Sequence, residues 1–325
     1  MIILSLFDGI AGVRQALKEL NIDCKYYASE IDKFAIQVAT ANHPDIKQIG
    51  DVKEVKDYSN IDLLIGGSPC QDLSIANKER KGLQGKRSGL FYEYLRILNE
   101  TKPKYFILEN VNSMAKVAKE TITKELFNIE PIMINSALVS AQQRKRLYWV
   151  GKLVDGKYKQ VKIEQPEDQK IYLKDVIEEN VDTKGIFFNK PNRIGQINKG
   201  CQGDRIYSVS GKSNCLTKVQ KDSLIININQ PFKRISKKGI VKKGIEKASC
   251  LTGGGNSGGN HSDMDLLEFP SIVRRLSTTE CCRLQGFPDD YVSMVSNTQG
   301  YKALGNSFTV PVIKHLIKSI KQCQK

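Results

Sequence analysis

The first half of the chain alternates short apolar runs with longer segments in which apolar residues recur every three or four positions. The short runs are typical of buried strands, and the longer segments are typical of amphipathic helices. We predict strands at residues 1–6, 26–29, 61–65, 105–108, 132–134 and 147–150, and helices at residues 11–20, 33–42 and 89–100. This alternation predicts an α/β domain with a mostly parallel sheet that helices cover on both faces.

Beyond residue 180 the alternation stops, and glycine, asparagine and lysine dominate the chain. Residues 253–260 are rich in glycine and predict a loop. Regular patterns return from residue 272, where we predict helices at residues 278–285 and 310–321. The predicted organisation is a first domain at residues 1–180, a smaller lobe at residues 185–270 and a C-terminal segment at residues 271–325 that returns to the first domain.

Positive charge is concentrated in the smaller lobe. The 325 residues carry a formal net charge of +15, and residues 184–247 hold 15 Lys and Arg against 3 acidic residues, or 15 − 3 = +12. A lysine-rich solvated surface and a polyanionic partner such as nucleic acid explain this excess equally well. Two stretches in the lobe, residues 211–217 and 246–252, share Cys-Leu-Thr and are either a small duplication or a chance similarity.

Cysteine usage argues against a metal site. None of the eight cysteines forms a Cys-x-x-Cys pair, and the three histidines are far apart, so we expect free thiols and no zinc.

No apolar stretch approaches the roughly 20 residues that a membrane span requires. Residues 1–6 are apolar, but no basic region precedes them, so they predict a strand rather than a secretion signal. We therefore expect a cytoplasmic protein.

Three successive strand ends, at residues 6–12, 29–32 and 50–52, carry residues suited to a nucleotide-like ligand. Small residues in the turn 6–12 would let a ligand approach the backbone, although the turn lacks the Gly-x-Gly-x-x-Gly pattern of hydride-transferring enzymes. Glu30 follows the next strand and is placed to bond ribose hydroxyls, while Asp51 could accept a hydrogen bond from an adenine amino group. Each acid alone is more often a helix cap or a solvated loop residue.

Cys70 follows Pro69 at the end of the apolar run 61–65. A free cysteine is usually a small buried hydrophobe. However, Cys70 lies at the ligand-binding end of a strand, and a polar, basic segment at residues 71–88 follows it. Such a segment is typical of a lid over an anionic substrate, so we interpret Cys70 as a nucleophile.

Two further segments offer partners for this thiol. Glu109 ends the next strand, where its carboxyl group could bind or protonate a ring nitrogen while sulfur attacks the adjacent carbon. Arg144 and Arg146 are two residues apart and would lie on one side of an extended segment, from which they could bind a phosphate or a carbonyl group.

These motifs, in this order, closely resemble those of the DNA (cytosine-5) methyltransferases. The resemblance covers residues 1–150 and 270–325 and includes Pro-Cys-Gln at 69–71, Glu-Asn-Val at 109–111 and Gln-x-Arg-x-Arg at 142–146. Residues 274–289 resemble the penultimate motif of that family, and Gly-Asn-Ser at 305–307 resembles its last. Residues 202–208 are similar to the start of the recognition lobe in small bacterial or phage enzymes.

The resemblance implies a Rossmann-like fold that binds S-adenosylmethionine, with a basic target-recognition domain at residues 185–270. It implies that Cys70 adds to C6 of a flipped-out cytosine, that Glu109 engages N3 and the amino group, and that Arg146 and Arg144 support the base or its phosphate. The cofactor pocket would contain Phe7, Asp8, Gly9, Gly12, Glu30, Ile31, Asp51, Val52, Pro69, Leu90, Asn306 and Ser307. Duplex DNA would contact Gln71, Ser74, Lys81, Arg87, Arg205, Tyr207, Lys212, Thr217, Thr252 and Gly254.

The chain departs from the family pattern at Ala11, where glycine is usual, and a methyl group is tolerable there. Two alternatives within the family are an RNA cytosine methyltransferase and a catalytically silent DNA-binding relative. The chain lacks the Cys-Phe-Thr signature associated with the transfer-RNA enzymes and retains every catalytic motif, so an active DNA enzyme is favoured. We expect a monomer without a metal, in a bacterial or phage-infected cell, with a restriction endonuclease for the same site as a possible partner.

Overall fold

The structure is a computed structural model. It describes residues 1–68, 89–178 and 276–322, together with the backbone of short strands at 206–208, 213–214, 224–226, 233–235, 241–243 and 274–275. The chain divides into two compact units. Unit 1 contains residues 1–135, 145–166 and 310–325, and unit 2 contains residues 136–144 and 167–309. The domain boundaries predicted near residues 180, 185 and 270 lie outside the described residues and stay predictions.

Unit 1 is built on a sheet in which the described strands follow the order β3-β2-β1-β4-β5-β8-β6, with β9 paired to β8. Strand β8 is antiparallel to β5, β6 and β9, and the other pairings are parallel. The strands are β1 (Ile2–Leu6), β2 (Lys25–Ser29), β3 (Lys47–Gln48), β4 (Leu63–Gly66), β5 (Tyr105–Val111), β6 (Ile132–Asn135), β8 (Lys145–Val154) and β9 (Lys157–Gln160). The prediction of a mostly parallel sheet is confirmed.

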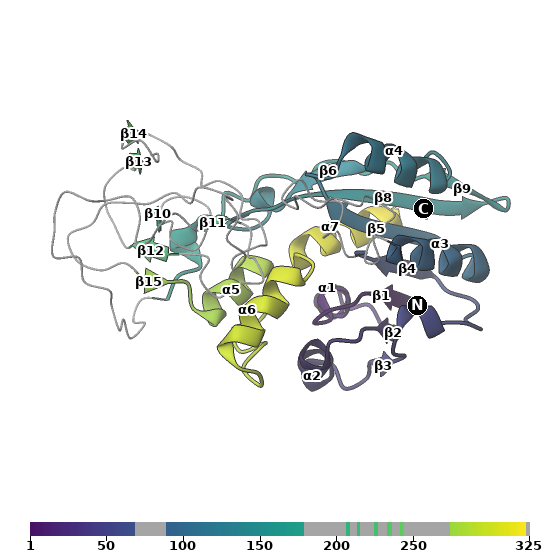
Figure 1. The fold of residues 1–325 in the computed structure, drawn as a ribbon, viewed down its shortest axis with the longest axis horizontal. Helices are drawn as coiled ribbons and strands as arrows, with labels where there is room; N and C mark the ends of the chain where they lie inside the picture. The colour runs from purple at the N-terminus through teal and green to yellow at the C-terminus, as the bar shows by residue number, and fades with distance from the viewer. Residues whose placement is uncertain are drawn as a thin grey trace. The chain divides into compact units, whose positions relative to one another are not determined.

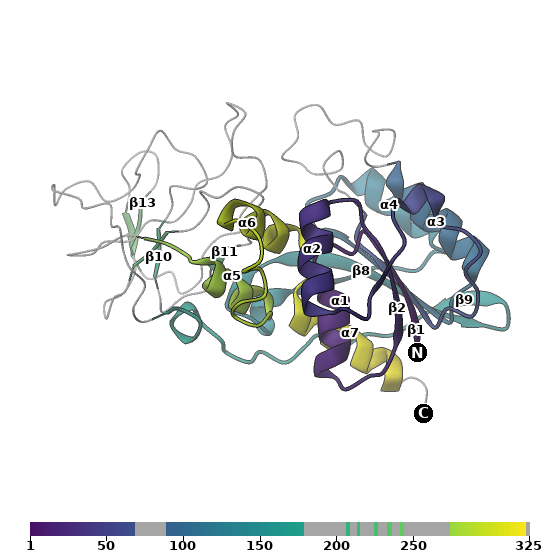
Figure 2. The same ribbon diagram turned by 90° about the horizontal axis from the view of Figure 1, so that it is seen from below.

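Helices cover both faces of this sheet (Figures 1 and 2). Helices α1 (Gly12–Glu19), α2 (Lys33–Asn42) and α7 (Val310–Gln322) lie on one face, and α3 (Leu90–Thr101) and α4 (Lys116–Glu125) lie on the other. Lys314 Nζ of α7 lies 2.7 Å from Glu19 Oε2 of α1. The end of the chain therefore packs beside its first helix.

The core between the sheet and α3 explains why these segments fold as predicted. Leu64, Phe106 and Trp149 come from neighbouring strands and share one hydrophobic cluster with Tyr94 and Ile97 of α3, and all five side chains are buried. Burial of apolar area on this scale stabilises a fold by about 25 cal/mol per Å². In each strand the apolar residues of this cluster recur at every second position, and in the helix they recur at every third or fourth position. Each element therefore keeps these residues on one face, which packs into the core.

Unit 2 contains α5 (Thr278–Gln285), α6 (Asn297–Asn306) and the strands β7 (Gln142–Gln143), β10 (Ile206–Ser208), β11 (Ser213–Asn214), β12 (Leu224–Ile226), β13 (Lys233–Ile235), β14 (Val241–Lys243) and β15 (Arg274–Arg275). Helix α5 begins with a capping box, in which Ser277 Oγ accepts from Glu280 N and Glu280 accepts from Ser277 N. It ends at Gly286, whose φ of 79° is the left-handed conformation that glycine favours.

The predicted strands and helices are confirmed to within four residues at their ends, and helices 33–42 and 278–285 match without a difference. Among the described α-helices and the described strands of four residues or more, sequence reasoning missed α4, α6 and β9. Helix α4 buries only Ala118, Ile122 and Thr123, and β9 is a polar edge strand with the sequence Lys-Tyr-Lys-Gln. Neither segment carries enough apolar residues to produce a readable period. No helix among the described residues is long and apolar enough to cross a bilayer.

Candidate active site

The ends of β4 and β5 lie side by side, because these strands are parallel and Gly66 pairs with Leu108. Asn110 of β5 is buried, and its Nδ2 donates to Ser68 Oγ over 3.3 Å. Asn110 Oδ1 accepts from Val111 N, which holds the amide in this orientation. The chain that leads toward Pro69 and Cys70 therefore starts beside the strand end that carries Glu109. Pro69 and Cys70 themselves lie outside the described residues.

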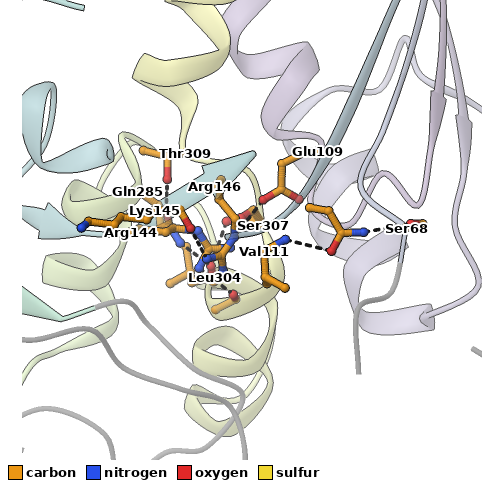
Figure 3. Close-up of polar contacts among 12 residues, drawn as sticks. Ser68, Glu109, Val111, Arg144, Lys145, Arg146, Gln285, Leu304, Ser307 and Thr309 are labelled. Carbon is orange, nitrogen blue, oxygen red and sulfur yellow. Dashed lines mark hydrogen bonds and ion pairs between the residues drawn. The ribbon is translucent and has the colours of Figure 1, made fainter. Parts of the chain in front are cut away.

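Glu109 forms an ion pair with Arg146 of the neighbouring strand (Figure 3). The Oε1–Nε distance is 2.8 Å, and each side chain is 15% exposed. The antiparallel register of β5 and β8, in which Val111 pairs with Arg146, brings the two side chains together. A carboxylate held at the edge of solvent by a guanidinium group retains lone pairs that can accept from an amino group, and once protonated it can donate to a ring nitrogen.

Arg144 has a different environment from Arg146. It is buried, and its guanidinium donates to Gly305 O over 3.2 Å and to Ser307 O over 3.0 Å (Figure 3). The two arginines, which we expected on one side of an extended segment, bind different groups, and Arg144 lies at a one-residue break between β7 and β8. Arg144 belongs to unit 2 and Arg146 to unit 1.

The turn after β1 is bound to the end of β2 through Glu30. Glu30 Oε2 accepts from Gly9 N over 2.9 Å, and Oε1 accepts from Ile31 N and Asp32 N. Gly9 has a φ of 62°, and a Cβ atom built there would meet nothing within 4 Å, so the space above the turn is open. The carboxylate of Glu30 thus organises a backbone turn that has room for a ligand.

Asp8 lies in the same turn, but its side chain is buried. Its Oδ1 accepts hydrogen bonds from Ser5 Oγ at 2.5 Å and from the hydroxyl of Tyr26 at 2.6 Å. Burial raises the pKa of Asp8 to about 7, although the two hydroxyl donors lower it in part and nearby Glu30 raises it further. Its Oδ2 is buried and has no hydrogen-bond partner among the described residues. The side chain of Asp8 supports the turn from inside rather than facing a ligand.

The other predicted pocket residues of unit 1 lie at strand ends or helix starts. Ile31 is 72% exposed directly after Glu30, which is unusual for a large apolar side chain. Asp51 Oδ1 accepts from Lys53 N and caps the 3-10 helix Val52–Glu54. Phe7 and Leu90 are partly buried against the core, whereas Gly12 and Val52 are buried.

The remaining predicted residues are described with their side chains, described by their backbone alone, or lie outside the described residues. In unit 2, Asn306 is exposed, and buried Ser307 donates its hydroxyl to Leu304 O over 2.8 Å. Strand β10 includes Tyr207, whose backbone alone is described. The predicted DNA contacts that lie outside the described residues are Gln71, Ser74, Lys81, Arg87, Arg205, Lys212, Thr217, Thr252 and Gly254. Among residues with described side chains, no group of three His, Cys, Asp or Glu could hold a metal ion.

Sequence reasoning missed three residues that shape the site: Ser5, Tyr26 and Ser68. Ser5 and Tyr26 carry hydroxyl groups in otherwise apolar strands, and a hydroxyl at a buried strand position requires a hydrogen-bond partner. This signal could have indicated a polar group such as Asp8 nearby. Ser68 gave no such signal, because it lies in a polar turn.

Comparison with known proteins identifies one family model and several relatives that this chain matches. The family model for C-5 cytosine-specific DNA methylases matches residues 1–322. The type II methyltransferase M.HhaI of Haemophilus parahaemolyticus is 27% identical over 344 residues, covering 98% of this chain and 93% of the relative. The type II methyltransferase M1.ScrFI of Lactococcus lactis subsp. cremoris is 30% identical over 323 residues, covering 95% and 75%. The orphan methyltransferase M.SPRI of Bacillus phage SPR is 27% identical, covering 98% and 97%.

Solved structures share the fold. The methyltransferase EhMeth of Entamoeba histolytica superimposes with a TM-score of 0.65 at 17% identity, covering 100% of this chain and 99% of that one. A mutant of Spodoptera frugiperda DNMT2 gives a TM-score of 0.63 at 18% identity, covering 98% and 99%. At these identities the likeness shows the architecture alone.

Proposed function

The chain belongs to the C-5 cytosine-specific DNA methylases, and we propose that it methylates cytosine in a short duplex sequence with Cys70 as its nucleophile. It is a DNA (cytosine-5) methyltransferase. The family model describes DNA enzymes and covers nearly the whole chain, which favours DNA over RNA as the substrate. The proposal concerns the residues that perform the reaction.

Methyltransferases of this family and fold use S-adenosylmethionine, which supplies the methyl group when bound. Features of unit 1 fit such a ligand: open space above Gly9, a carboxylate at Glu30 suited to ribose hydroxyls, and the exposed apolar surface of Ile31 for a ring. Phe7, Asp51 and Leu90 would complete the pocket. Asp8 would act through the shape of the turn, since its carboxyl group is buried.

Cys70 would add to C6 of a cytosine that is flipped out of the duplex. A thiol with an ordinary pKa of about 8.5 is a weak nucleophile near neutral pH, so the addition needs a charge acceptor on the base. Glu109 would protonate N3 as the C6–S bond forms, and the electron pair of the C5–C6 bond would make C5 nucleophilic. After C5 has taken the methyl group, the C5 proton would pass to water, the C5–C6 double bond would re-form as the C6–S bond breaks, and N3 would return its proton to Glu109, which leaves 5-methylcytosine and the free thiol.

The observation that carries this assignment is the Glu109–Arg146 ion pair at the strand end beside Ser68. Arg146 fixes the carboxylate of Glu109 in one place, which reduces the cost of ordering it in the transition state. Ser68 precedes Cys70 by only two residues in the sequence, which supports our proposal that the nucleophile acts beside this carboxylate.

The positive charge concentrated at residues 184–247 falls mostly within the proposed target-recognition domain and would neutralise DNA phosphates. The proposed division of the chain is a catalytic domain at 1–180, the recognition domain at 185–270 and a returning segment at 271–325. We further propose a monomer that acts on DNA in the cytoplasm. Because both type II and orphan enzymes are among its relatives, a cognate restriction endonuclease stays a prediction.

Methyl transfer from radiolabelled S-adenosylmethionine to duplex DNA tests the function, with transfer RNA as the matched alternative substrate. Incorporation into DNA alone is expected, and bisulfite sequencing of DNA from cells expressing the protein would then identify the methylated sequence. Incorporation into RNA alone, or label on adenine, would contradict the proposal.

A further inference from the structure

Arg144 and Arg146 are close in sequence, yet the structure binds them to different groups. Arg146 contacts the carboxylate of Glu109, whereas the guanidinium of Arg144 donates to two main-chain carbonyls. Resemblance to the family suggested one shared role at the substrate. The contacts indicate that Arg144 has a separate role at the end of helix α6.

The carbonyls that Arg144 binds belong to the last turn of α6 and the residue after it. The last four carbonyls of a helix lack partners inside the helix, and this end carries a partial negative charge. Arg144 reaches Gly305 O at 3.2 Å and Ser307 O at 3.0 Å, so it satisfies two acceptors on either side of Asn306. A planar guanidinium can bridge two acceptors in this way, and an ammonium group cannot hold the same geometry.

Other buried groups bind the neighbouring carbonyl. Leu304 O accepts from Gln285 Nε2 at 2.8 Å and from Ser307 Oγ at 2.8 Å. Gln285 Oε1 in turn accepts from Thr309 Oγ1 at 2.8 Å. Gln285, Ser307 and Thr309 are all buried, so these bonds are poorly accessible to water. These hydrogen bonds thus fix the segment 304–309 on both sides of one position.

That position is Asn306, which is the one exposed residue between Ala303 and Val310. The backbone of Arg144 is itself fixed, because Ser136 N donates to Arg144 O over 3.0 Å and Ser136 Oγ donates to Gln142 O over 2.8 Å. A rigid buried arginine therefore anchors both peptides that flank an exposed asparagine.

We propose that Arg144 is a positioning residue, which clamps the carbonyls of Gly305 and Ser307 and thereby holds Asn306 ready to bind the cofactor. This rests on the proposed function and on the assignment of Asn306 to the cofactor pocket, which the resemblance to the family implies. Arg146 then positions Glu109, which acts on the base. Arg144 positions Asn306, which binds the cofactor.

Hydrogen exchange and cofactor-product affinity together test the clamp. In Arg144→Lys, amides at residues 305–309 are expected to exchange at least about 10-fold faster, and the Kd for S-adenosylhomocysteine is expected to rise roughly 10- to 100-fold. Arg146→Lys should change neither quantity. Arg283→Lys is the matched control in unit 2, because Arg283 binds Asp289 and Val176 O rather than α6.

A double variant separates positioning from general destabilisation. If Arg144 acts through Asn306, the effects of Arg144→Lys and Asn306→Ala on the Kd will be far from additive. Additive effects, unchanged exchange at 305–309, or faster exchange with an unchanged Kd would each overturn the inference. Wild-type protein that binds S-adenosylhomocysteine but does not methylate DNA would contradict the proposed function alone.

Discussion

Glu109 and Arg146 form an ion pair across strands β5 and β8, with Oε1 and Nε 2.8 Å apart and both side chains mostly buried. The pair is set by strand register, because Val111 pairs with Arg146 and Glu109 with Tyr148. Register is insensitive to side-chain motion, so the carboxylate is held in place before the substrate arrives. Pre-organisation of this kind is what acid–base catalysis requires.

We predict that Glu109→Gln lowers kcat by about 10²- to 10⁴-fold, because the amide cannot donate a proton to N3. Arg146→Lys should lower kcat less, and adding it to Glu109→Gln should cost little more, since the two groups act as one unit. Single-turnover methylation at saturating DNA measures both effects. Glu120→Gln is the control, because Glu120 pairs with Lys116 on the surface of α4. Strictly additive losses would contradict a shared role.

Cys70→Ser should abolish methylation while leaving the affinity for duplex DNA largely intact. A hydroxyl group is a far weaker nucleophile than a thiolate and would not add to C6 at a useful rate. Wild-type protein should form a covalent adduct with DNA that contains 5-fluorocytosine at the target, because fluorine cannot leave as the C5 proton does. Gel electrophoresis under denaturing conditions detects the adduct. Cys24→Ser serves as the control, and substantial turnover by Cys70→Ser would refute the assignment.

The raised pKa of Asp8 predicts that the free energy of unfolding depends on pH. Its pKa is raised by burial from 3.8 to about 7, so the folded state binds more protons than the unfolded state between about pH 4 and pH 7. The contribution of Asp8 is therefore fully present below pH 4 and is lost as pH rises through 7. The free energy of unfolding of the wild type should fall, relative to that of Asp8→Asn, by on the order of 4 kcal/mol across this range.

Urea unfolding at several pH values measures this difference. Asp23→Asn is the matched control, because Asp23 is exposed. The same pH dependence in wild type and Asp8→Asn would show that Asp8 does not titrate in this range.

The basic lobe predicts strong salt dependence of DNA binding. Each phosphate that the protein neutralises contributes about 0.9 to the slope of log Kd against log salt concentration. Replacing Lys242 and Lys243 by alanine should lower that slope by about 2 if both contact phosphates. Fluorescence anisotropy with nonspecific duplex DNA measures it, and Lys116→Ala on α4 is the control. A slope near zero in the wild type would show that the lobe does not neutralise DNA phosphates.

Prediction from sequence succeeded where the signal is local. The strands around Leu64 and Phe106 and the helix around Tyr94 carry apolar residues at the period of their own secondary structure. It failed at α4 and α6, which are polar and owe their stability to packing by a few side chains such as Ile122 and Leu304. Short polar helices are marginal in isolation, so the tertiary contacts decide them.

By itself, the sequence determined the strand–helix order, the family, and the strand ends that carry Glu30 and Glu109, because all of these follow from patterns along the chain. The tertiary structure alone decided that Asp8 is buried and that Arg144 binds the end of α6 while Arg146 binds Glu109. Arg144 and Ser307 are 163 residues apart in the chain. A hydrogen bond depends on the distance between atoms in space, and no spacing in the sequence encodes a contact of that range.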